Sequence, residues 1–114
     1  MVNTRAKGNK IQRRLMTELE DEGWLVDKVE KTGRFTKQKD LFGLFDLCCV
    51  RKHTMKLIQV TCNRPHKHTP YLSFAIQYGH NKLLIEQHVW YDRKGWKEFN
   101  YHWNKGMMIE DRRK

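Results

Sequence analysis

The chain has 114 residues, enough for one domain with a single modest core and too few to divide comfortably into two. Its 23 Lys and Arg residues outnumber 13 Asp and Glu, giving a net charge of +10. Such a surplus attracts phosphate backbones; the alternative is a soluble basic protein with no such partner. No apolar run could cross a bilayer, and the polar, basic N-terminus lacks the apolar segment of a signal peptide. We therefore expect a cytoplasmic protein without a membrane partner, in the host cytoplasm if a virus encodes it.

The cysteines are too few and too close together for a disulfide framework. Cys48 and Cys49 are adjacent, and Cys62 is the third. All three fall in predicted strands, where free thiols pack as small apolar groups. We expect no disulfide.

The first predicted element is a helix over residues 9–22. Ile11, Leu15 and Leu19 recur every four residues, and Gly23 supplies a stop. Basic residues near its start and acidic residues near its end oppose the helix dipole. We interpret the basic end as a contact for a nucleic-acid backbone; the alternative is a solvated face. The predicted contacts in this part of the chain are Arg5, Lys7, Lys10 and Arg13.

Residues 24–30 are predicted to form the first strand, and residues 31–39 a basic loop. Four cations in this loop are predicted to touch phosphates: Lys31, Arg34, Lys37 and Lys39. Phe35 would pack against the core or stack on a base. The alternative is a solvated loop anchored by Phe35.

Two short strands, about residues 44–50 and 57–62, form the centre of the predicted sheet. Asp46 interrupts an apolar run in the first strand, while Gln59 and Thr61 share one face of the second. If the strands pair across the turn at residues 51–54, Asp46 lies near both. A buried carboxylate is costly unless it is paired, hydrogen-bonded or bound to a metal.

The loop at residues 63–70 is basic, and we expect Arg64 and Lys67 to contact nucleic acid. Cys62, His66 and His68 offer zinc donors, but a fourth ligand is missing and the spacing matches no zinc signature. Residues 71–78 are predicted to be a helix, with a strand as the alternative. Residues 83–91 and 96–103 read as a hairpin, whose aromatic residues are core rather than a stacking platform. Residues 107–114 look frayed.

The segment from Lys39 to Leu47, followed by Ile58-Gln59-Val60-Thr61, resembles the PD-(D/E)XK nuclease superfamily, in which an Asp precedes Glu-x-Lys on the next strand. It is similar to small phage, plasmid and archaeal members, including Holliday-junction resolvases. The resemblance implies a restriction-endonuclease-like fold: a mixed sheet of about five strands flanked by two helices. We expect one domain over residues 1–114, with 1–8 and 107–114 flexible.

The resemblance also implies a site, although its motif is degenerate here. Gln12 stands at the position of a helical Glu that helps to hold the metal, Gln59 replaces the strand carboxylate, and Thr61 replaces the lysine. Asp46 would be the main ligand for Mg²⁺ or Mn²⁺ and Gln59 a second, with Asp40 or Glu22 as a third. A lysine from another position would have to replace the missing cation: Lys10, Lys39 or Lys56.

Three functions follow from these features. The first is a metal-dependent endonuclease that acts on branched or duplex DNA. The second is an inactive relative that binds DNA or a partner protein, which the lost charges at positions 12, 59 and 61 favour. The third is an RNA-binding module, although the chain has no recognisable RNA-binding motif. A homodimer is implied by the resemblance alone.

Overall fold

The computed structural model describes residues 4–29 and 41–112, with side chains from residue 7 onward. Two helices and six strands follow one another along the chain: α1 (Thr4–Asp21), β1 (Leu25–Lys28), β2 (Leu47–Arg51), β3 (Thr54–Cys62), α2 (Thr69–Tyr78), β4 (Leu83–Tyr91), β5 (Gly95–His102) and β6 (Gly106–Arg112). The strands form one sheet in the order β1-β2-β3-β4-β5-β6.

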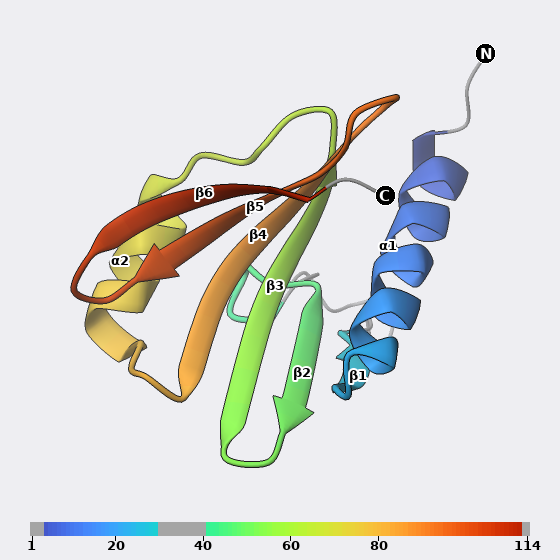
Figure 1. Ribbon diagram of the computed structural model, residues 1–114. Coiled ribbons are helices and arrows are strands. Elements are labelled where there is room, and N and C mark those ends of the chain that lie inside the picture. The colour runs from blue at the N-terminus through green and yellow to red at the C-terminus, as the bar shows by residue number, and fades with distance from the viewer. Residues whose placement is uncertain (1–3, 30–40, 113–114) are drawn as a thin grey trace, which may run out of the picture.

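The sheet is mixed because one central pair of strands is parallel. β3 and β4 run parallel, and all other neighbours run antiparallel. A parallel pair needs a crossover connection, which α2 provides. The carboxyl ends of β3 and β4 therefore meet at one edge of the sheet, close to the beginning of α1 (Figure 1).

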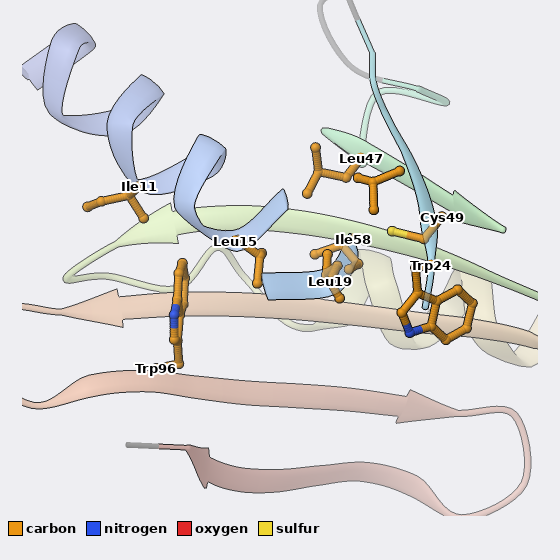
Figure 2. Packing of buried hydrophobic residues seen from close by; sticks show 9 residues of the cluster. Ile11, Leu15, Leu19, Trp24, Leu47, Cys49, Ile58 and Trp96 are labelled. Carbon is orange, nitrogen blue, oxygen red and sulfur yellow. The ribbon is translucent and has the colours of Figure 1, made fainter. Parts of the chain in front are cut away.

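The two helices cover opposite faces of the sheet. On one face, Leu15 and Leu19 of α1 pack against Ile58 of β3 and Trp96 of β5 (Figure 2). On the other face, α2 packs against a second apolar cluster: Phe45, Leu57, Tyr71, Ala75, Ile85, Val89, Phe99 and Tyr101. Because side chains alternate along a strand, Gln59 and Thr61 of β3 lie on the α2 face with Leu57.

The predicted layers are confirmed: one mixed sheet with two flanking helices. The sheet has six strands rather than about five, because the C-terminal segment expected to fray pairs with β5 as β6. Gly106, with a φ of 82°, makes the tight turn between them. Helix α1 also begins at Thr4, within the segment expected to be flexible.

Cys48, Cys49 and Cys62 are all free, and burial raises the pKa of the Cys49 thiol to about 12. In the described part of the chain, neither helix combines the length and apolar character needed to span a bilayer.

Leu15 tests the packing of α1 on the sheet. Leu15 is fully buried, so Leu15→Ala leaves a cavity and should lower the free energy of unfolding by about 3 kcal/mol. The exposed Leu25 of β1 provides the control, and Leu25→Ala should change stability by less than about 0.5 kcal/mol. Denaturant unfolding followed by circular dichroism measures both. Equal effects would contradict the packing of α1.

Candidate functional site

Asp46 is fixed to β3 by its main chain and by its side chain. Its N–H donates to Ile58 O at 2.8 Å, and its carbonyl accepts from Val29 N–H at 2.8 Å. Its carboxylate Oδ2 accepts a hydrogen bond from Val60 N–H at 3.1 Å. Val60 lies between Gln59 and Thr61, so the half-buried carboxylate is held at the two polar positions of β3. The predicted proximity of these three residues is thus present.

Two oxygen atoms beside Asp46 are buried without a hydrogen-bond partner in the described structure: Gln59 Oε1 and Thr61 Oγ1. Gln59 is only 4% exposed. An unpaired buried acceptor costs about 1 to 3 kcal/mol, so these atoms fit a bound ligand or water. A carboxylate, an amide carbonyl and a hydroxyl are also the hard oxygen donors that Mg²⁺ prefers.

A hollow of about 350 Å³ lies at the end of β3, between the first half of α1 and the loop that follows β3. It is lined by Gly8, Ile11, Val60, Thr61, Cys62, Arg64 and His66. Gln12 is half-buried next to Ile11 in α1. A second hollow of about 240 Å³ shares Ile11 and is otherwise lined by Lys7, Lys10, Arg14 and Trp90. Arg64 therefore borders the first hollow, and three cations of α1 border the second.

The predicted nucleic-acid contacts divide into three groups. Lys10, Arg13, Arg64 and Lys67 are exposed, as a phosphate contact requires. Lys7 instead lies 2.6 Å from Asp92 Oδ2, a hydrogen bond that lowers the pKa of Asp92 and raises that of Lys7. The remaining predicted residues lie outside the described side chains: Arg5, Lys31, Arg34, Lys37, Lys39 and the proposed metal ligand Asp40.

Two residues considered for the site lie elsewhere. Lys56 is on the α1 face, 3.4 Å from Glu86 Oε2 and 4.7 Å from the centre of the Trp24 ring, so it does not replace the lysine missing at position 61. Glu22 pairs with Arg112 at 3.3 Å, near the end of α1. Neither side chain shares the face of Gln59.

The loop after β3 does not form the zinc site considered from its sequence. His66 Nδ1 lies 3.2 Å from the Tyr71 hydroxyl, and His68 Nδ1 lies 2.7 Å from the Tyr101 hydroxyl. Among the described residues, the one group of three possible metal-binding side chains within 4.8 Å is Glu86, His88 and Glu98, which the sequence analysis missed.

That group belongs to a buried charge network on the α1 face. His88 Nε2 lies 2.7 Å from Glu86 Oε1 and 3.4 Å from Glu98 Oε1. The outer oxygen atoms face cations: Lys56 lies 3.4 Å from Glu86 Oε2, and Arg112 lies 3.2 Å from Glu98 Oε2. Burial alone would raise the pKa of Glu86, but the hydrogen bond from His88, the charge of His88 and the charge of Lys56 lower it below its ordinary value.

The surroundings of His88 indicate whether this network is structural or a metal site. Its Nδ1 is buried without a hydrogen-bond partner in the described structure. A metal on Nε2 would displace the hydrogen bond that Nε2 donates to Glu86 Oε1, and both carboxylates already have a cation at their outer oxygens. We therefore interpret the network as structural. Three consecutive polar residues, 86–88, inside an apolar strand were its signal in the sequence.

Comparisons with known proteins support the fold. The chain matches no protein-family model and no curated protein. A similar solved structure is Hjc, a Holliday junction resolvase from the archaeon Archaeoglobus fulgidus. The two share 17% sequence identity with a TM-score of 0.57, over 91% of this chain and 88% of that one. The likeness shows that the fold is shared.

The charge network gives a stability prediction. Lys56→Met leaves Glu86 without its cation, so the free energy of unfolding should fall by about 3 kcal/mol. The exposed Lys52 of the β2–β3 turn provides the control, since Lys52→Met should cost less than about 0.5 kcal/mol.

The lowered pKa of Glu86 predicts how the stability of the protein depends on pH. Because its pKa is lower in the folded protein, the stabilisation is present above the unfolded-state pKa and is lost as pH falls through the folded-state value. Denaturant unfolding of Glu86→Gln from pH 7 into the acid range should therefore show a weaker pH dependence than the unchanged protein. Parallel curves would show that Glu86 does not contribute.

Proposed function

We propose that this protein is a metal-dependent endonuclease that cuts branched or duplex DNA. The observation that carries the proposal is the grouping of Asp46 with the unpaired buried oxygens of Gln59 and Thr61, beside a hollow that Arg64 also lines. The shared fold supports it, because the similar archaeal protein is a Holliday junction resolvase.

In this proposal, Asp46 and Gln59 hold Mg²⁺ or Mn²⁺ directly, and Asp40 would be a third ligand. Thr61 and Gln12 would support these ligands without contacting the ion. The bound ion would neutralise phosphate charge and polarise a water molecule. The protein's own groups supply the rest. Arg64 and Lys67 would bind the DNA backbone beside the hollow, and Lys10 and Arg13 would extend this contact along α1.

A different function is favoured by the reduced charge of the site. Asp46 is the one carboxylate among the three residues gathered on β3, and a single negative charge holds a divalent ion weakly. The alternative is a protein of the same fold that binds DNA, or a partner protein, without cutting it.

Cleavage of labelled DNA distinguishes these functions. Four-way-junction, duplex and single-stranded DNA are incubated with Mg²⁺ or Mn²⁺. The unchanged chain should cut junction or duplex DNA, and Asp46→Asn, which keeps the shape of the side chain, should reduce the rate at least about 100-fold.

Asp27→Asn is the matched control, because Asp27 is exposed on β1. It should cut at the rate of the unchanged chain. Binding without cleavage, with equal affinity in the Asp46 variant, would instead support the inactive alternative.

We further propose that the protein is a homodimer. The α2 face carries an apolar groove of about 790 Å³ lined by Leu41, Phe42, Cys48, Met55, Leu57, Phe74, Tyr78 and Leu83. Phe42 and Tyr78 are each about 60% exposed, and large exposed apolar patches mark interaction sites. A second copy would cover the groove through a two-fold interface.

Analytical ultracentrifugation over a range of protein concentrations tests the dimer. Met55→Glu places a charge in the groove and should shift the protein toward monomer by at least about tenfold in dissociation constant. Thr17→Glu adds the same charge on the exposed side of α1, across the sheet from the groove, and should leave the dimer intact. A monomer at every concentration would disprove the proposal.

A further inference from the structure

The loop that follows β3 is attached to the interior of the sheet by one amide side chain. Gln87 of β4 is fully buried, and its Oε1 accepts a hydrogen bond from His66 N–H at 2.6 Å. Its Nε2 donates to His66 O at 3.4 Å and to the Tyr101 hydroxyl at 2.9 Å. Both main-chain polar groups of His66 are thus held by one residue. This fixes the position of His66 relative to β3.

The imidazole of His66 has one ring nitrogen next to a tyrosine hydroxyl, and the residue is exposed to solvent. Its Nδ1 lies 3.2 Å from the Tyr71 hydroxyl on α2. The residue is exposed and lines the same hollow as Thr61, Cys62 and Arg64. When Nδ1 carries the hydrogen and donates it to Tyr71, Nε2 holds the lone pair of a base.

Among the described residues, no lysine of β3 lies on the face of Gln59 and Thr61, where it could take a proton from an attacking water. Thr61 stands where the resembling family has its lysine, and the hydroxyl of threonine does not ionise near neutral pH. Lys56 is held on the opposite face by Glu86. A histidine changes charge between about pH 5 and 8, so it can accept and release a proton under ordinary conditions.

We propose that His66 is the proton-transfer residue of this site, positioned by Gln87 and Tyr71. This inference rests on the proposed nuclease function. As the attacking water forms its bond to phosphorus, Nε2 of His66 takes the proton from that water. The bond between phosphorus and the leaving sugar oxygen breaks, and this oxygen takes a proton from solvent. His66 then returns its proton to solvent, and Arg64 beside it holds the phosphate charge.

Cleavage rates of full-length variants test the role of His66. At saturating DNA and Mg²⁺, His66→Gln should lower the rate about 100-fold, the usual scale of general acid–base catalysis, while DNA binding changes less than about threefold. His68→Gln is the matched control. His68 lies in the same loop, but its Nδ1 faces the Tyr101 hydroxyl. It should retain the rate of the unchanged chain.

Two further readouts separate proton transfer from a merely structural role. The rate of the unchanged chain should rise with pH as a general base loses its proton, and His66→Gln should lose this rise. Adding Thr61→Lys to the His66→Gln variant restores the lysine that the resembling family has at this position. The double variant should cut at least tenfold faster than His66→Gln alone. Tyr71→Phe should shift the pH profile without reducing DNA affinity.

The outcomes distinguish failure of the proposed role of His66 from failure of the proposed nuclease function. If the unchanged chain cuts DNA and His66→Gln cuts within threefold of it with the same pH profile, His66 has no role in proton transfer and the nuclease function stands. If the unchanged chain does not cut any of the substrates, the nuclease function is overturned and the role of His66 with it.

Discussion

The hydrogen bond from Val60 N–H to the Asp46 carboxylate is the constraint on which the candidate site depends. It ties the residue that precedes β2 to the polar part of β3, and the main-chain bonds of Asp46 to Ile58 and Val29 fix the same register. A one-residue slip of β3 would move Gln59 and Thr61 to the α1 face and bring apolar side chains to Asp46. The pairing that builds the core of the sheet therefore also assembles the site.

The two faces of the sheet carry polar groups of different kinds. On the α1 face, Glu86 and Glu98 meet Lys56 and Arg112, so each buried carboxylate has a cation at its outer oxygen. On the α2 face, the buried polar groups of β3 and β4 are neutral amides and a hydroxyl, and Gln87 holds the loop that follows β3. Charges on the first face compensate one another, which suits a structural role. Neutral groups with unpaired oxygens on the second face suit the binding of a ligand.

The sequence predicted those elements whose pattern is local. The four-residue spacing of Ile11, Leu15 and Leu19 identified α1, and the alternation around Gln59 assigned β3 and its polar face. β6 was missed because Met107, Met108 and Ile109 are consecutive and exposed, so pairing with β5 rather than an apolar face defines the strand.

Contacts between distant segments could not be predicted in the same way. The parallel register of β3 and β4 places Gln59 beside Gln87, and no local pattern encodes it. The same holds for Glu98, which reaches His88 only through the pairing of β4 with β5. The resemblance to a nuclease family identified Asp46, Gln59 and Thr61, but it gave no reason to single out Gln87 or His66.

The state of Gln59 bears on whether the site has merely decayed. Its carbonyl oxygen is buried without a partner in the described structure, at a cost of about 1 to 3 kcal/mol. An apolar side chain of similar length, such as methionine, would remove this cost and pack against Leu57 and Val89 on the same face. A site without a ligand gains nothing from the amide, whereas a site that binds a cation or an ordered water recovers the cost. The unpaired oxygen beside Asp46 therefore points to a bound partner at this position, either a cation or an ordered water.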